Sequence, residues 1–160
     1  MDKLMTAELK RFNYLTNEID AAYHEAARKL HLSDSALIIL YTICNYGDSC
    51  LLSDIHRLSG ISRQTINSSL RRLEADGIVY LKVFEGKKKK VYLTAKGQEL
   101  AENTAVRLIE IENSIFASWK EDEKMLYLEL TQRYLLSFQE SIKELNFIQK
   151  NPGEERNYPK

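Results

Sequence analysis

The segment from Gly60 to Gly97 constrains the fold of this 160-residue chain more than any other part of the sequence. Residues 62–76 are polar, with an apolar residue at every third or fourth position, which predicts a helix with one buried face. Two β-rich runs follow, 78–84 and 89–93, and the short glycine-containing connection between them predicts a hairpin. We therefore expect a solvent-facing helix followed by a small β-hairpin.

Charge is unevenly distributed along the chain. Residues 51–97 contain ten basic and four acidic side chains, a net charge of +6, whereas the whole chain contains 23 of each. The rest of the chain must therefore have a net charge of −6. Four consecutive lysines, Lys87–Lys90, occupy the expected tip of the hairpin, where they repel one another and do not stabilise the fold. A solubilising loop is one interpretation, but a basic patch that attracts phosphates over long range is the one we favour.

A short helix at about residues 53–58, ending at Ser59-Gly60, would complete a helix-turn-helix with the helix that starts at Ser62. Ile66, Leu70 and Leu73 would form the inner face of that second helix. Its outer side chains could read base edges through hydroxyls and amides and reach phosphates or guanine through arginines. An ordinary solvated face is the alternative. The candidate DNA-binding residues are Ser62, Arg63, Gln64, Thr65, Asn67, Ser68, Arg71 and Arg72 in this recognition helix and Lys87, Lys88, Lys89 and Lys90 in the hairpin.

Amphipathic helices are expected before this module. An apolar stripe at helical spacing runs from Met5 to Leu30 on one face of a long first helix, and Ser33 is a suitable N-cap for a second helix that reaches about Tyr46. The second helix is apolar on nearly all sides, so we expect it to be buried centrally.

Two further helices are expected after the hairpin. Residues 93–97 begin a long helix in which the apolar residues from Leu100 to Trp119 share a face, and Ser118 with Glu121 predicts a capping box for the last helix. That last helix also has a continuous apolar stripe. A small winged module cannot cover the stripes at both ends of the chain, which indicates a homodimer. The predicted dimer interface contains Leu9, Phe12, Leu15, Ile19, Leu135, Phe138, Ile142 and Leu145.

These features resemble the winged helix-turn-helix of the MarR family of multiple antibiotic resistance regulators. The matching residues are Ser62, Thr65-Ile66, Leu70, Leu73-Glu74, Gly77-Ile78-Val79 and Val91-Tyr92-Leu93-Thr94-Ala95-Lys96-Gly97. The resemblance implies a mainly α fold with a small β-hairpin wing (α+β), a winged helix-turn-helix flanked by long N- and C-terminal dimerisation helices. The sequence departs from the family in two ways: Glu85 and Lys87 stand where Asp-x-Arg is common, and His56 stands where alanine is usual.

The predicted domain organisation follows the layout that the resemblance implies. Residues 1–32 form an N-terminal dimerisation helix, residues 33–97 the DNA-binding domain, residues 98–149 the C-terminal dimerisation helices and residues 150–160 a flexible tail. Within the domain, the recognition helix is expected at about 62–76 and the wing at about 78–93.

The resemblance implies a sequence-specific regulator that binds a pseudo-palindromic double-stranded DNA operator as a homodimer, with repression as the expected outcome. Release by a small aromatic effector is an open option, and Tyr14, Tyr23, Tyr41 and Tyr46 are candidates for its pocket. Tyrosines at helical spacing are also common in cores. The alternative function is a winged-helix interaction module whose lysines bind an acidic protein.

Other classes of function find little support in the sequence. There is no phosphate-binding loop, nucleophile elbow or glycine-rich cofactor turn, so we expect neither an enzyme nor a cofactor. His24, His31 and His56 lack metal-site spacing, and Cys44 and Cys50 are interpreted as reduced thiols, with oxidant sensing left open. The chain has no apolar run of about 18 residues and no signal peptide, which predicts a cytoplasmic protein without a membrane partner.

Overall fold

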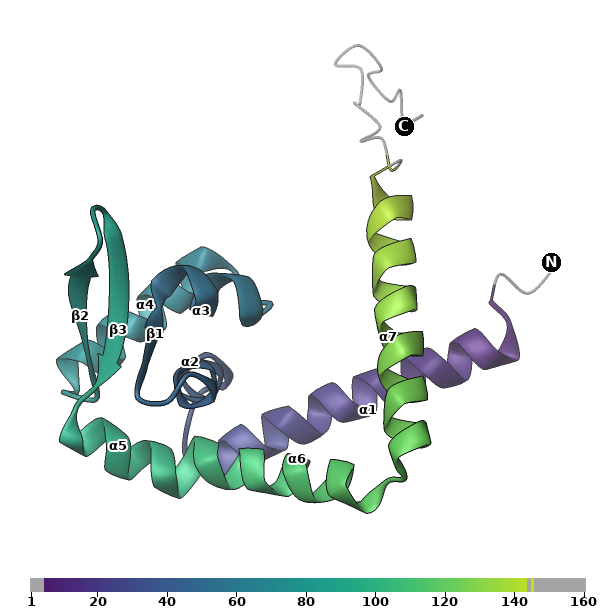
Figure 1. Cartoon of the computed structure of the whole chain (residues 1–160), viewed down its shortest axis with the longest axis horizontal. Coiled ribbons are helices and arrows are strands. Elements are labelled where there is room, and N and C mark those ends of the chain that lie inside the picture. The colour runs from purple at the N-terminus through teal and green to yellow at the C-terminus, as the bar shows by residue number, and fades with distance from the viewer. Residues whose placement is uncertain (1–4, 144, 146–160) are drawn as a thin grey trace, which may run out of the picture. The chain divides into compact units, whose positions relative to one another are not determined.

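The computed structural model describes residues 5–143 and 145 and divides the chain into two compact units, residues 1–114 and 115–160 (Figure 1). The predicted tail, residues 150–160, lies outside the described residues. The elements are α1 (Ala7–Lys29), α2 (Asp34–Asn45), β1 (Ser49–Leu51), α3 (Leu52–Leu58), α4 (Arg63–Ala75), β2 (Val79–Phe84), β3 (Lys88–Leu93), α5 (Ala95–Ala101), the π-helix η1 (Glu102–Val106), α6 (Arg107–Ser118) and α7 (Glu121–Ile142). The predicted mainly α fold with a small β wing is therefore confirmed.

Helix α2 forms the centre of the first unit, as its apolar sequence predicts. It packs against α3 and α4 on one side and against α5 and η1 on the other (Figure 1). Ile39, Leu40 and Ile43 in α2 are completely buried. The buried side chains around them are Ile55, Ile66, Leu70, Leu73, Val79, Val91, Ala101 and Ala105. The predicted inner face of the recognition helix is thus correct, and this core fixes the orientation of α4.

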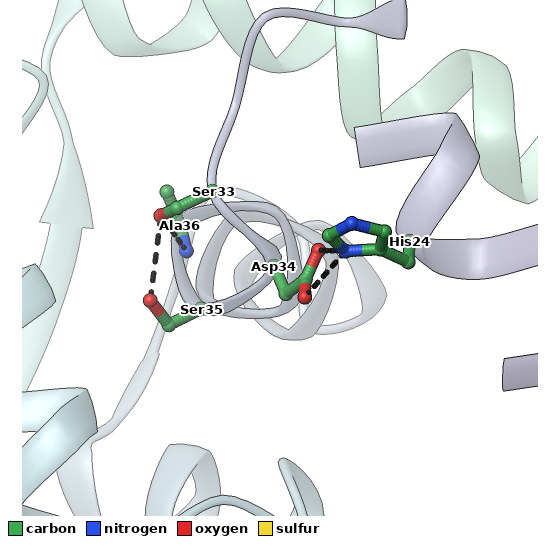
Figure 2. Close-up of polar contacts among 5 residues, drawn as sticks. All are labelled: His24, Ser33, Asp34, Ser35 and Ala36. Atoms are coloured by element: carbon green, nitrogen blue, oxygen red, sulfur yellow. Dashed lines mark hydrogen bonds and ion pairs between the residues drawn. The ribbon is translucent and has the colours of Figure 1, made fainter. Parts of the chain in front are cut away.

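Hydroxyl side chains cap four of the helices, and at the start of α1 the Thr6 hydroxyl accepts from the Leu9 backbone N–H at 3.1 Å. The Ser33 hydroxyl accepts a hydrogen bond from the Ala36 backbone N–H at 3.2 Å at the start of α2 (Figure 2). Thr65 N–H donates to the Ser62 hydroxyl at 3.1 Å at the start of α4, and Thr94 serves α5 in the same way. These caps satisfy N–H groups that a helix leaves unpaired, and they explain why the elements start where the sequence predicts.

The sheet has three antiparallel strands in the order β1-β3-β2, whereas the sequence predicted a two-stranded hairpin. β1 pairs Cys50 with Val91, next to the β2–β3 ladder. The predicted second strand, 89–93, is confirmed and begins one residue earlier, at Lys88, so of the four lysines predicted at the tip only Lys87 lies in the turn. The turn contains Glu85, Gly86 and Lys87, and the first two have φ of 38° and 66°.

The helix after the wing is interrupted where the sequence predicted a continuous one. Leu100 and Leu108 pack against the core and Thr104 is buried, as expected for the predicted face. The π-helix η1 then changes the helical phase, because a π turn holds an extra residue. Ile111, predicted on the same face, is 57% exposed in this single chain.

The second unit contains the end of α6 and the whole of α7. Here the predicted cap is wrong: the Ser118 hydroxyl donates to Ile115 O at 2.6 Å, and α7 starts after Lys120. Lys120 N–H donates to the Glu123 carboxylate at 2.8 Å, so the reciprocal half of a capping box is present two residues later. Phe116, Trp119 and Tyr127 form an aromatic cluster around this turn.

The apolar stripes predicted for dimerisation are uncovered within this single chain. In α1 only Ala27 is buried, and the side chains from Leu9 to Ile19 on its stripe are exposed. In α7 no residue is buried. Within the described part of the chain, no helix is long and apolar enough to cross a membrane.

Candidate nucleic-acid interface

The outward face of α4 is polar along its whole length. All eight candidate residues of this helix are exposed, while Ile66, Leu70 and Leu73 hold the opposite face in the core. A period of 3.6 residues places Gln64, Ser68 and Arg71 in the middle of the exposed face. These three side chains therefore point most directly away from the module.

Two candidate hydroxyls already have partners in the fold. Ser62 caps α4, and its hydroxyl also forms a 2.9 Å hydrogen bond with the Thr65 hydroxyl. Both residues remain exposed, so they stay predictions as DNA contacts, but their main structural role is to start the helix.

One flank of α4 faces the beginning of α2. An open hollow there is lined by Ser33, Ser35, Gln64, Thr65, Ser68, Ser69 and Arg72. The Ser35 and Ser69 hydroxyls are hydrogen-bonded across it, which ties α2 to α4. Sequence reasoning missed Ser35, because a serine in the first turn of a helix is ordinary and nothing in the sequence indicates its neighbour in α4.

The other flank of α4 faces α3 and the wing. A hollow at this junction is lined by Leu52, Ser53, His56, Arg57, Arg63 and Lys87–Lys89. Arg57 was counted only as charge in the sequence, and here it joins Arg63 and the wing lysines while pairing with Asp54 at 3.2 Å. The fold thus gathers five cationic side chains from three separate segments on one side of the recognition helix.

Lys90 is separated from the other three wing lysines. Its partner in the β2–β3 ladder is Lys82, and like charges opposite each other destabilise a sheet. The Lys90 ammonium lies 5.3 Å from the centre of the Tyr92 ring and 5.6 Å from that of Phe84, and Lys82 lies 5.2 Å from that of Tyr80. Contacts of cations with aromatic faces offset part of the repulsion.

The candidate effector tyrosines divide into two pairs. Tyr23 and Tyr41 line a cavity of about 380 Å³ between α1, α2, α6 and the turn before α4, whereas Tyr14 and Tyr46 do not line it. Both lining phenols donate to the Glu112 carboxylate, Tyr41 at 2.6 Å. Burial, and then the hydrogen bond to Glu112, raise the pKa of Tyr41 to about 12. Sequence reasoning missed Glu112, which on a helix face has the pattern of a solvated residue.

Two further carboxylates, Asp20 and Asp34, line the same cavity. The His24 imidazole lies 2.9 Å from the Asp34 carboxylate and joins α1 to the start of α2 (Figure 2). Among the residues the structure describes, no group of three or more His, Cys, Asp or Glu side chains could hold a metal ion.

The cysteines are poorly placed for rapid oxidation. Cys50 is 2% exposed, and its burial, together with the nearby Asp54 carboxylate, raises its pKa to about 12; burial also raises the pKa of half-buried Cys44. Because the thiolate is the reactive form, both thiols should be less reactive than a free cysteine at neutral pH.

We expect Cys50 in a folded Cys44→Ala variant to react with a disulfide reagent at pH 8 at least tenfold more slowly than after unfolding in urea. The Cys50→Ser variant, which leaves only Cys44, serves as the comparison and should react at an intermediate rate. Reaction of folded Cys50 as fast as the unfolded protein would contradict the burial argument.

The fold and its basic face define a winged helix-turn-helix protein. Residues 31–89 match the family model described as MarR family. A comparison with curated protein sequences gives no match.

Solved structures share the fold over most of the chain. A MarR family regulator from Neisseria meningitidis superposes with a TM-score of 0.77 at 17% identity, covering 88% of this chain and 100% of that one. The transcription regulator MarR from Oenococcus oeni gives a TM-score of 0.62 at 18% identity, with 79% and 96% covered. MepR from S. aureus, in a complex with DNA, gives 0.61 at 20% identity, with 84% and 98% covered.

Proposed function

We propose that the chain is a sequence-specific, double-stranded DNA-binding transcriptional regulator that acts as a repressor. The observation that supports this most strongly is the exposed polar face of α4 beside a hollow that gathers Arg57, Arg63 and Lys87–Lys89. A helix of this kind fits the major groove, while the neighbouring cations meet phosphates. The similarity to MepR, whose structure includes DNA, adds support at the level of the fold.

Titration of a fluorescent random duplex at increasing salt tests the proposal. We expect tight binding at low salt, with the logarithm of the association constant falling by about 0.9 per neutralised phosphate for each tenfold rise in salt. Selection from a random duplex pool should then yield a preferred, two-fold symmetric sequence. No duplex binding even at low salt would favour the alternative, an interaction module for an acidic protein.

We also propose a homodimer in which the apolar stripes of α1 and α7 are buried. The support is their exposure in the single chain: Leu9, Phe12, Leu15, Ile19, Leu135, Phe138, Ile142 and Leu145 are all exposed. Contiguous apolar stripes of this length are unfavourable in water and mark interaction surfaces. A two-fold dimer would present two recognition helices to the two halves of a symmetric operator.

Light scattering at micromolar concentration should therefore give about twice the chain mass of 18.6 kDa. The double variant Leu135→Glu/Phe138→Glu should shift the protein towards the monomer, because it places charges in the stripe. Gln132→Glu/Gln139→Glu adds the same charge to α7 and is the matched control. A wild-type monomer, or equal dissociation of both variants, would refute this interface.

The cavity at Tyr23 and Tyr41 is the site we propose for a small aromatic effector that releases DNA. Its lining includes Ser59 and Ile61, which lie in the turn between α3 and α4, so an occupant could alter the position of the recognition helix. Asp20, Asp34 and Glu112 make the lining acidic, and the Tyr41 phenol, whose pKa is raised to about 12, is neutral at pH 7. This chemistry favours an aromatic ligand that has an amino group over an aromatic carboxylate.

Paired aromatic amines and carboxylates of equal size, screened for displacement of bound duplex, test this assignment. Replacing Glu112 with glutamine should weaken an active amine by about tenfold, because it removes a charge-assisted hydrogen bond. Glu110→Gln, an exposed residue of the same helix, is the control. Stronger displacement by the carboxylates would contradict the proposed chemistry.

A further inference from the structure

His56 in α3 and Asn67 in α4 are joined by a side-chain hydrogen bond across the helix-turn-helix. The His56 Nε2 atom lies 3.1 Å from Asn67 Oδ1. A carboxamide oxygen can only accept, so His56 is the donor and its Nε2 atom carries the proton. The histidine that departs from the usual alanine thus makes a specific contact with a candidate DNA-reading residue.

The pair lies at the edge of the reading face. His56 is half-buried and lines the two hollows between α3, α4 and the wing, together with Arg63, Arg71 and Lys89. Asn67 is exposed, and it stands three residues after Gln64 and four before Arg71, so the three side chains are neighbours on one side of the helix. A change in the orientation of Asn67 would therefore change the surface presented to a base pair.

The hydrogen bond selects one of the two orientations of the Asn67 amide. With Oδ1 held towards α3, the Nδ2 amino group faces away from α3. An unrestrained asparagine recognises adenine through its oxygen and its amino group together. Because the oxygen is turned towards His56, the amino group is the amide atom left to face a base edge, and it can only donate.

We propose that His56 is a positioning residue that makes Asn67 a donor-only reader of the base edge. Asn67 would then select an acceptor in the major groove, such as guanine O6 and N7 or thymine O4, and discriminate against the donor of a cytosine amino group. The inference rests on the proposed DNA-binding function and adds to it the residue that sets specificity at one base pair of each half-site.

The test uses the full-length protein and an operator selected from a random duplex pool with the wild type. Single-base-pair variants of that operator are then bound competitively by wild type, Asn67→Ala, His56→Phe and His56→Gln. Phenylalanine keeps a ring but removes the donor, whereas glutamine retains a donor. Thermal melting of each variant and affinity for random duplex report on folding and on sequence-independent binding.

We expect His56→Phe to reduce discrimination at one base pair by about fivefold or more, with random-duplex affinity unchanged. Asn67→Ala should affect the same base pair, the double variant should lose no more than Asn67→Ala alone, and His56→Gln should restore discrimination. Unchanged discrimination in His56→Phe, an additive double variant, or loss confined to melting temperature would overturn the inference. A wild type that binds random duplex but yields His56-independent specificity overturns this inference alone; absence of all duplex binding overturns the proposed function itself.

Discussion

Replacing Gly97 with alanine should lower the free energy of unfolding by about 2 kcal/mol or more, the upper range for overpacking. A Cβ atom at this position would lie 2.0 Å from the Ile78 backbone oxygen. That oxygen has little freedom to move, because it accepts hydrogen bonds from Thr94 N–H at 3.0 Å and from the Thr94 hydroxyl at 3.2 Å. The close approach of α5 to the start of the wing therefore requires glycine.

The sign of this effect separates packing from helix propensity. Alanine is favoured over glycine inside a helix by about 1 kcal/mol, so without the close contact Gly97→Ala would stabilise the protein. Urea unfolding followed by circular dichroism measures the difference, and Gln98→Ala at the adjacent exposed position should change stability by less than about 0.5 kcal/mol. An alanine variant at least as stable as the wild type would show that α5 can move away from Ile78.

Replacing Lys87–Lys90 with glutamine should weaken binding to every duplex by a similar factor. If each lysine neutralises one phosphate, the slope of log affinity against log salt should become less steep by about 3 to 4. Because Lys90 lies over aromatic rings instead of in the basic hollow, reverting position 90 to lysine in this variant should recover less affinity than reverting position 89. Glutamine keeps a flexible polar side chain without the charge.

A matched control separates local contacts from overall charge. Lys10, Lys29, Lys124 and Lys143 are replaced together by glutamine, which gives the same change in net charge at residues outside the winged module. This variant should remain folded, since exposed ion pairs such as Lys29–Glu25 contribute little to stability. It should also keep most of the salt dependence, because the four lysines lie outside the winged module. Equal loss in both variants would indicate that net charge, and not the wing, determines affinity.

The sequence predicted those features of the fold that depend on local patterns. The α4 helix is evident from its 3.6-residue apolar period, and Ser62 and Ser33 cap helices because their hydroxyls satisfy unpaired N–H groups. Such signals lie within a few residues of the structure they specify, so one sequence is sufficient to detect them.

Features that depend on distant partners could not be predicted in the same way. The strand β1 has three residues, too few for a visible alternation, and it exists because β3 offers a free edge to pair with. Lysine has a low preference for strands, so Lys88 was predicted to lie in the connection before a strand at 89–93, yet it pairs with Phe84 in the ladder with β2, and β3 starts at Lys88.

The candidate site likewise combines features that local sequence patterns predict with features that depend on distant partners. The polar face of α4 was evident from the sequence, but the neighbours of that face, Ser35 and Arg57, became apparent only from the packing of α2 and α3. Likewise, Tyr23, Tyr41 and Glu112 are separated by up to 89 positions, and no local pattern connects the two phenols with their shared carboxylate.

The π-helix η1 makes the cavity dependent on a backbone irregularity. Glu112 comes six residues after Val106, the last residue of η1, and its angular position on α6 is set by the extra residue that the π turn holds. Deleting one residue from η1 would restore an ordinary helix and rotate α6 by about 100° relative to α5. A gain in helical regularity would thus turn the carboxylate away from both tyrosines. A relative with one residue fewer here would need a different acceptor for its two phenols, so the length of this segment is a marker of ligand chemistry that residue identity alone would miss.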